Sequence, residues 1–203
     1  MTEKAKQLYI HVPFCKRKCN YCDFCSFPVE SEQKAAYVKA LEKEISLVRY
    51  DGRISTCFIG GGTPSLLSPK ELSDVVSSCR KKFDFSPEEF TVEANPESLT
   101  KDFLIAAKDA GINRISLGVQ SFSDDNLKLM GRLHDSVQAI SAVKLAKSVF
   151  ENVSADLILG FPNTDEKQAE SAVRLLSELG ITHVSAYGLQ LEEGTKLFEM
   201  VKN

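Results

Sequence analysis

The chain has 203 residues, of which 43% are hydrophobic and 26% are charged, and its formal net charge is −3. This composition is typical of a globular protein with a full core, so it excludes a disordered or fibrous chain, and the charge gives no general attraction to nucleic acid or anionic membranes. No apolar run approaches the roughly 20 residues that span a bilayer, and the polar start Met1 to Gln7 predicts no secretory signal. We therefore expect a cytoplasmic location, or an organellar one after processing of a precursor.

Short apolar segments alternate with amphipathic helical patterns along the chain. The predicted strands are 8–12, 56–59, 90–93, 114–119, 154–159 and 183–187. The predicted helices cover 32–49, a segment starting at Pro69, 101–110, 124–130, 136–149, 166–179 and a last segment starting at Thr195. Ser68 before Pro69 is a typical N-cap, and Gly111 and Gly180 are typical C-terminal caps.

These elements form six βα units of roughly 30 residues each, a pattern that predicts a parallel sheet with right-handed crossovers. A partial (β/α)6 barrel and a doubly wound open sheet both fit this pattern, whereas a complete eight-unit barrel typically needs about 250 residues. Unusual residues follow the end of each of the six strands, as in barrel enzymes, and not a single switch point. We therefore predict one α/β domain over 1–203, a partial (β/α)6 barrel of parallel strands.

The six cysteines are unevenly placed. Four of them, Cys15, Cys19, Cys22 and Cys25, fall within eleven residues, whereas Cys57 and Cys79 stand alone. A disulfide framework is not expected, because such frameworks spread their cysteines through small secreted chains. The spacing C-x3-C-x2-C suits three irons of a [4Fe–4S] cluster and leaves the fourth iron open for a ligand. A closed zinc site that also uses Cys25 is the alternative.

The two remaining cysteines have a simpler interpretation. Cys57 falls on a predicted strand and Cys79 on a predicted helix. A free cysteine in such a position usually behaves as a small apolar residue. We expect both of them in the core.

The cysteine spacing, placed directly after the first predicted strand, resembles the signature of the radical S-adenosylmethionine superfamily. Further segments resemble the oxygen-independent coproporphyrinogen III oxidase family, and within it the HemW-type heme chaperone branch. These segments are 9–15, 22–24, 60–64, 93–97, 118–122 and 156–160. The resemblance extends from about residue 8 to 195. It implies the radical SAM core, a partial barrel, here without the C-terminal domain that shapes the tetrapyrrole site in most of the family.

The resemblance also implies the cofactors and their ligands. Cys15, Cys19 and Cys22 correspond to the cluster ligands, and Cys25 to a nearby thiol without a ligand role. In that superfamily the open iron binds S-adenosylmethionine, and one electron cleaves it to a 5′-deoxyadenosyl radical. The protein positions the cofactor and excludes side reactions. Heme is a further ligand that the chaperone branch implies.

Eleven residues match positions that contact the cofactor in the family. They are Tyr9, Tyr21, Gly61, Gly62, Thr63, Glu93, Gln120, Arg132, Asp156, Tyr187 and Gln190. Plainer interpretations exist for several: packing aromatics for the tyrosines, a turn for the glycines, a solvated acid for Glu93, and a helix cap or surface ion pair for Arg132. Asp156 stands in an apolar strand, where a carboxylate is costly unless it is paired or lies at a site. No catalytic residue is assigned.

Other polar residues near these motifs have open interpretations. His11 is either a site residue or packs under the predicted cluster loop, residues 13–25, which we call the cysteine loop. His134 and His183 are expected to be structural or at the surface. The basic run 16–18 is either a solvated loop or a docking point for an acidic electron donor. The pair 124–125 is expected to cap a helix.

Three functions compete. The first is a HemW-type chaperone that binds heme and passes it to an acceptor protein. The second is oxygen-independent oxidative decarboxylation of coproporphyrinogen III, against which Phe24 argues, because the oxidase branch carries a further cysteine there. The third is a zinc-binding structural module. The expected partners are a tetrapyrrole (heme or coproporphyrinogen), an electron-donor protein and a heme-acceptor protein; no nucleic acid and no transmembrane segment are expected.

Overall fold

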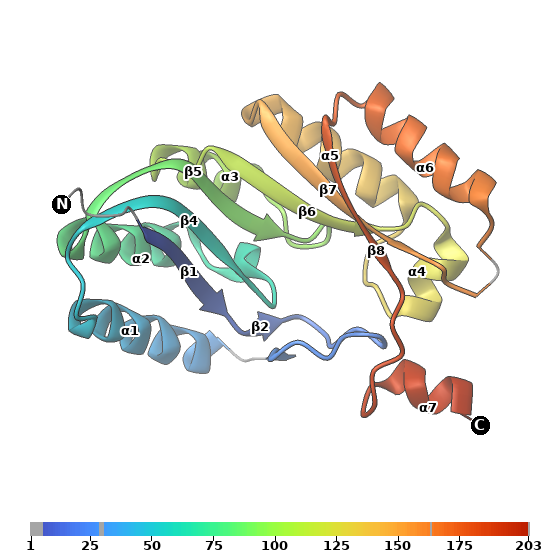
Figure 1. The fold of residues 1–203 in the computed structure, drawn as a ribbon, viewed down its shortest axis with the longest axis horizontal. Helices are drawn as coiled ribbons and strands as arrows, with labels where there is room; N and C mark the ends of the chain where they lie inside the picture. The colour runs from blue at the N-terminus through green and yellow to red at the C-terminus, as the bar shows by residue number, and fades with distance from the viewer. Residues whose placement is uncertain (1–5, 29–30, 163, 203) are drawn as a thin grey trace.

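The computed structural model describes residues 6–28, 31–162 and 164–202, and its centre is one sheet of six parallel strands (Figure 1). The strands are β1 (Lys6–Val12), β4 (Arg53–Gly61), β5 (Asp84–Ala94), β6 (Arg114–Gln120), β7 (Asn152–Leu159) and β8 (His183–Gly188). They neighbour one another in this same order, without any reversal. A doubly wound sheet would reverse its order at a switch point, so this topology is the barrel type of winding.

Helices occupy the connections between these strands. They are α1 (Ser31–Leu47), α2 (Pro69–Lys82), α3 (Lys101–Asp109), α4 (Asp124–Met130), α5 (Ser136–Val149) and α6 (Glu166–Glu178), with α7 (Lys196–Lys202) after the last strand. Helix α1 packs against α2, α2 against α3, and α3 against α5, so they line one side of the curved sheet (Figure 1). Among the described residues, none of the helices is both long and apolar enough to cross a membrane.

The two faces of the sheet differ in chemistry because successive side chains of a strand point to opposite faces. Val92, Ile115 and Leu117 are fully buried in the apolar core. The alternate positions carry polar side chains that share a level across neighbouring strands: Glu93 pairs with Ser116, and Ser116 pairs with Ser154. The sheet therefore presents an apolar face to the core and a polar face on its other side.

The expected α/β class is confirmed, and each predicted strand and helix is present. The main differences are at strand beginnings: β4 starts at Arg53 and β5 at Asp84. The first half of β5 alternates exposed and half-buried residues and contains Pro87, so it lacks the apolar run that marks a buried strand. The short parallel pair β2 (Phe14–Cys15) and β3 (Phe27–Pro28) and the 3-10 turn η1 (Pro64–Leu66) were not predicted.

The helix-cap prediction for the pair 124–125 needs a correction. The N-cap of α4 is Ser123, whose side chain accepts a hydrogen bond from Asn126 N–H. Asp124 instead accepts a hydrogen bond from the backbone N–H of Ser136, at 2.8 Å, and so ties α4 to the start of α5. A serine one position earlier has the same capping ability as an aspartate.

Replacing Leu117 with alanine tests the central core. Leu117 lies on β6 and is 0% exposed, so Leu117→Ala leaves a cavity and should lower the free energy of unfolding by about 2–5 kcal/mol. Val137→Ala, on the exposed side of α5, should change it by less than about 0.5 kcal/mol. Urea unfolding of both variants measures the difference, and equal effects would contradict the assigned core.

Candidate functional site

A cavity of about 600 Å³ lies at the C-terminal ends of the strands, where the sequence places its unusual residues. Its lining combines the cysteine loop with residues from the ends of β4, β5, β6, β7 and β8. Of the fourteen residues predicted for the site, twelve line this cavity: Cys15, Cys19, Tyr21, Cys22, Gly61, Gly62, Glu93, Gln120, Arg132, Asp156, Tyr187 and Gln190. Their ligand roles stay predictions, but the fold brings them to one place.

The other two predicted residues lie outside the lining. Thr63 is buried behind it, and its hydroxyl lies 3.6 Å from the sulfur of Cys15, close enough to donate a hydrogen bond. Tyr9 is 56% exposed and stacks on Phe58, and its hydroxyl lies 3.1 Å from Nδ1 of His11. Tyr9 therefore reaches the site only through its neighbours in this structure.

His11 supports the far end of the cysteine loop. Its Nε2 lies 2.8 Å from the carbonyl oxygen of Cys25, so the ring can donate a hydrogen bond to the loop. The hydroxyl of Tyr37 donates to the carbonyl of His11 at 2.7 Å. The packing interpretation of His11 is therefore the one that its contacts favour.

The basic run of the cysteine loop is bound to the protein itself. Lys16 Nζ donates to the carbonyl of Glu97 at 2.8 Å, and Arg17 Nη2 donates to the carbonyls of Gly131 and Arg132 at 2.6 and 2.8 Å. Lys18 donates to the carbonyls of Phe24 and Ser26. Lys16 and Arg17 are exposed to solvent, as a solvated loop requires, but all three side chains of the run also hold backbone carbonyls. Docking of an acidic electron donor stays a prediction.

The cysteines differ in exposure in a way that separates them into groups. Cys57 and Cys79 are buried in the core, as expected. Cys15, Cys19 and Cys22 are half-buried free thiols at the cavity, and Cys25 is exposed. The three thiols at the cavity come from one loop and can serve together as ligands.

Hydrogen-bond donors already face two of these sulfurs. Thr63 lies beside Cys15, and Arg132 Nη1 lies 3.4 Å from the sulfur of Cys19. Donors of this kind stabilise sulfur that carries negative charge, as thiolate ligands do. The thiols thus fit an iron–sulfur cluster, which distributes its thiolates over separate irons.

A single metal ion has no comparable site. Among the residues that the structure describes, no group of three or more His, Cys, Asp or Glu side chains is arranged to hold one. A structural zinc site needs four ligands that converge on one point. The zinc alternative therefore lacks support from the geometry.

The glycines after β4 allow the cysteine loop and the strand end to approach closely. Gly61 has a φ of +115°, and a Cβ on it would lie 2.7 Å from the ring of His11. A Cβ on Gly62 would lie 2.6 Å from the backbone oxygen of Phe14. Glycine is needed at both positions, because a side chain on Gly61 would collide with His11 on β1 and one on Gly62 with the backbone of Phe14, where the loop that carries the cysteines begins.

Two carboxylates face the cavity from neighbouring parts of the sheet. Burial raises the pKa of Glu93 to about 7, and the nearby Asp156 adds to this, while a hydrogen bond from Gly61 N–H at 2.9 Å acts in the opposite direction. Burial also raises the pKa of Asp156, which accepts hydrogen bonds from the hydroxyl of Ser116 at 3.3 Å. The solvated-acid interpretation of Glu93 is therefore wrong.

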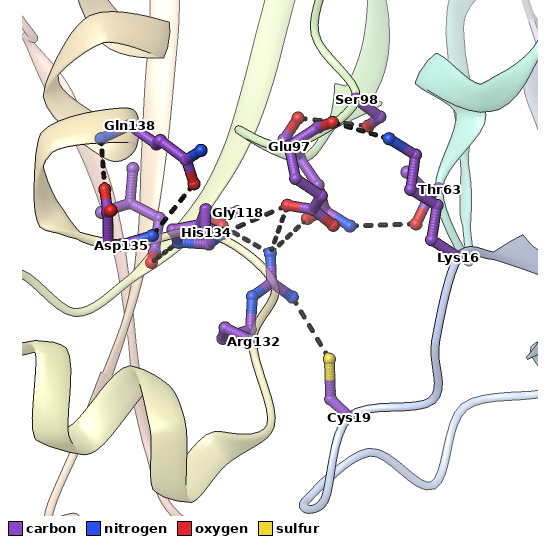
Figure 2. Close-up of polar contacts among 12 residues, drawn as sticks. Lys16, Cys19, Thr63, Glu97, Ser98, Gly118, Arg132, His134, Asp135 and Gln138 are labelled. Atoms are coloured by element: carbon purple, nitrogen blue, oxygen red, sulfur yellow. Dashed lines mark hydrogen bonds and ion pairs between the residues drawn. The ribbon is translucent and has the colours of Figure 1, made fainter.

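Arg132 joins the site from the segment after α4. Its side chain is only 5% exposed, and its Nη2 donates to Oδ1 of Asn95 at 2.7 Å and to the carbonyl of Gly118 at 2.9 Å. Asn95 in turn donates from Nδ2 to the hydroxyl of Thr63 at 2.9 Å, so one network connects Cys19 to Thr63 (Figure 2). Through the hydroxyl of Thr63 this network also reaches the sulfur of Cys15. The interpretation of Arg132 as a surface residue or simple helix cap is wrong.

Three residues of this network, Asn95, Glu97 and His134, were not among the residues predicted for the site. Asn95 and Glu97 follow β5 inside the segment 93–97, and their position just after a strand end was the available signal. His134 was expected to be structural or at the surface; it is 3% exposed, so the surface interpretation is wrong. Its nearness to Arg132 along the chain was the only hint.

Comparison with known proteins gives the following similarities. A family model described as "Radical SAM superfamily" matches residues 9–176. The heme chaperone HemW of Lactococcus lactis is 39% identical over 197 residues, which cover 96% of this chain and 52% of the relative. The heme chaperone HemW of Escherichia coli is 39% identical over 93% of this chain and 51% of the relative. The chain thus spans about half the length of these curated relatives.

Solved structures show the same fold. Coproporphyrinogen III oxidase (HemN) from Escherichia coli superposes with a TM-score of 0.84 at 26% identity, over 98% of this chain and 52% of that one. The structure of anSMEcpe with bound AdoMet superposes with a TM-score of 0.66 at 12% identity, over 91% of this chain and 52% of that one, and this likeness concerns the fold alone.

The close approach at Gly62 can be tested with a matched glycine. Gly62→Ala should lower the free energy of unfolding by about 1–3 kcal/mol, because the new methyl group meets rigid backbone. Gly188→Ala, also at the cavity but with nothing within 4 Å of the new Cβ, should change it by less than about 0.5 kcal/mol. Thermal and urea unfolding check this, and similar losses in both variants would contradict the close approach.

The raised pKa of Glu93 predicts a pH dependence of stability. The folded chain holds this proton more tightly than the unfolded chain, so the free energy of unfolding should fall as pH rises from about 4.5 to about 7, by up to roughly 3 kcal/mol. Glu93→Gln keeps an acceptor for Gly61 N–H and should remove this part of the fall. Urea unfolding across that range measures it, with Glu88→Gln, in an exposed ion pair, as control. If the free energy of unfolding falls with pH as steeply in Glu93→Gln as in the wild type, the prediction is contradicted.

Proposed function

Because this chain belongs to the radical SAM superfamily, we propose that it holds a [4Fe–4S] cluster and S-adenosylmethionine in the cavity and serves as the core of a HemW-type heme chaperone. The observation that carries the first part is the placement of three free thiols on one loop, opening onto a cavity whose other walls are strand ends. When bound, the cluster supplies one electron to S-adenosylmethionine, which is the radical chemistry of the superfamily.

In this proposal the cluster ligands are Cys15, Cys19 and Cys22, and the remaining iron faces the cavity. Thr63 and Arg132 support the arrangement by donating to ligand sulfurs. Hydrogen bonds to such sulfurs are one of the means by which a protein tunes an iron–sulfur cluster. Cys25 has no ligand role, in keeping with its exposure.

The cofactor would lie between the glycine segment and the sheet. The backbone of Gly61 and Gly62 carries no side chain that would block a close approach; the N–H of Gly61 donates to Glu93 and that of Gly62 to the carbonyl of Val12. Glu93 and Asp156 line the cavity, and their carboxylates would accept hydrogen bonds from hydroxyl groups of the cofactor. Tyr21, Tyr187 and Gln190 complete the cavity on the side of the cysteine loop and β8, and Tyr9 contributes through His11.

Heme binding and transfer are the finer part of the proposal. The curated relatives described as heme chaperones support it, as does Phe24, which is 65% exposed and lines the cavity where the oxidase branch carries a further cysteine. The partners in this proposal are heme, an electron-donor protein and a heme-acceptor protein. Oxidation of coproporphyrinogen III is the second candidate, which the structural similarity to HemN favours.

Anaerobic reconstitution with iron and sulfide tests the cluster ligands. Replacing Cys15, Cys19 or Cys22 with serine should remove most of the bound iron and the visible absorption of the cluster, because each loses a thiolate. Cys25→Ser, in the same loop, is the matched control and should retain both. A colourless wild-type chain that holds zinc, and loses it in Cys25→Ser, would support the zinc module instead.

Heme titration and a turnover assay separate the two finer functions. We expect the reconstituted chain to bind heme, as monitored by its absorption spectrum, and to leave the propionates of coproporphyrinogen III intact in the presence of reductant and S-adenosylmethionine. Loss of propionate carboxylates would support the oxidase. A chain that binds S-adenosylmethionine but not heme would contradict the chaperone proposal and leave the cluster proposal standing.

A further inference from the structure

The carboxylate of Glu97 is buried between two side chains that can carry positive charge. Its Oε2 lies 3.1 Å from Nδ1 of His134 and 3.9 Å from Nη2 of Arg132, and its side chain is 14% exposed. Burial acts to raise the pKa of Glu97, but the hydrogen bond from His134 and the charge of Arg132 outweigh this and lower it. The structure therefore holds a buried carboxylate in its ionised form beside the cysteine loop.

Both neighbours of Glu97 also bind the backbone at the end of β6. Arg132 Nη2 donates to the carbonyl of Gly118 at 2.9 Å. Nε2 of His134 lies 3.1 Å from the carbonyl of Val119, which can only accept, so the ring donates there. With one ring nitrogen facing Glu97 and the other facing Val119, His134 connects a carboxylate to a strand end (Figure 2).

The two carbonyls come immediately before an unusual backbone conformation. Gln120 has a φ of +67°, the one positive φ outside glycine among the described residues. The pairing of β6 with β7 shifts its register between Leu117 and Gln120. A left-handed conformation in a residue with a side chain persists only where the surroundings hold it, and such residues cluster at functional sites. The bend is closed by a hydrogen bond from Ser121 N–H to the carbonyl of Val119 at 2.8 Å, and Arg132 and His134 hold the carbonyls of residues 118 and 119 beside it.

The same carboxylate residue anchors the cysteine loop. The backbone carbonyl of Glu97 accepts a hydrogen bond from Lys16 Nζ at 2.8 Å, and Arg132 Nη1 lies 3.4 Å from the sulfur of Cys19. Glu97 thus stands between the loop that carries the thiols and the bend that carries Gln120. Displacing its side chain would remove the carboxylate that balances the charge of Arg132 and would leave the guanidinium to the neutral partners Asn95 and Gly118 and to Cys19.

We propose that Glu97 and His134 are positioning residues that fix the guanidinium of Arg132 beside Cys19 and fix the left-handed bend that directs Gln120 into the cavity. Neither side chain needs to touch the cofactor; each acts through Arg132 and the carbonyls of residues 118 and 119. The effect on cofactor binding rests on the proposed function. The fixing of the bend at Gln120 does not depend on any cofactor.

The first experiment uses the chain without cofactors. His134→Ala should increase amide hydrogen exchange of peptides covering 118–122 and 131–134 by roughly tenfold or more, because the carbonyl of Val119 loses a donor and Glu97, which pairs with Arg132, loses its hydrogen bond from His134. Peptides of β1 and β4 should exchange as in the wild type. Asn113→Ala is the matched control: Asn113 also holds backbone, at Phe90 N–H and the carbonyl of Glu88, but at the opposite end of the sheet.

The second experiment uses the chain reconstituted with its cluster. His134→Ala should weaken binding of S-adenosylmethionine by about 10- to 100-fold, the usual effect of losing a residue that orients a ligand group, and should change the electron paramagnetic resonance spectrum of the reduced cluster. Glu97→Gln keeps the shape of the side chain without its charge, so it should show the same changes at smaller size. This variant also serves if His134→Ala does not fold.

The outcomes separate this inference from the proposed function. If the wild-type chain takes up neither cluster nor S-adenosylmethionine, the proposed function fails, and the exchange experiment still decides whether the bend is held. If His134→Ala and Glu97→Gln change exchange and cofactor affinity no more than Asn113→Ala does, the two residues only stabilise the fold and the inference is overturned. Faster exchange at 118–122 together with weaker cofactor binding supports it.

Discussion

A buried guanidinium organises the site, because a charge removed from water is costly unless it is paired. The two Nη atoms of Arg132 contact the amide of Asn95, the carbonyl of Gly118, the carboxylate of Glu97 and the sulfur of Cys19, whereas its buried Nε has no hydrogen-bond partner among the described residues. These partners come from the cysteine loop and from the ends of two strands. One side chain therefore fixes three separate segments relative to one another, and the geometry of the thiols depends on it.

The polar face of the sheet is the second requirement of the site, because carboxylates can remain buried against it. Asp156 and Ser116 share a hydrogen bond across β6 and β7, and Ser154 donates to Ser116 on the same face. Glu93 is held by the backbone of Gly61 on the next strand. An apolar floor would make these carboxylates far more costly, so the alternation of polar and apolar residues along the strands prepares the cavity as well as the core.

The cysteine loop is held by polar contacts with the segments around it. Its basic residues bind carbonyls of the segments around it, and the short pair β2 and β3 closes its base. A loop that must hold three thiols in a fixed arrangement gains from such contacts, since each backbone carbonyl it satisfies also restricts its freedom. The positive charges therefore have a structural use before any partner is considered.

Much of the molecule follows from the sequence alone. The alternation of β-rich and amphipathic segments predicts six βα units, and the placement of Cys15 and Gly61 at strand ends predicts that they share a site, because parallel strands end at one edge of the sheet. The alternation of polar and apolar side chains along a strand is visible in the sequence itself, and so is the helix cap at Ser68. Such features depend on neighbours in sequence and can be recognised there.

Contacts between distant segments were decided only by the tertiary structure. His134 gives no local sign that it will be buried against Glu97, 37 residues away, or against the carbonyl of Val119. The exposure of Tyr9, the left-handed backbone of Gln120 and the carbonyl contacts of Lys16 have the same origin. A side chain's partner across the fold depends on the packing of whole elements, so the pairing of buried charges appears only once those elements have been placed.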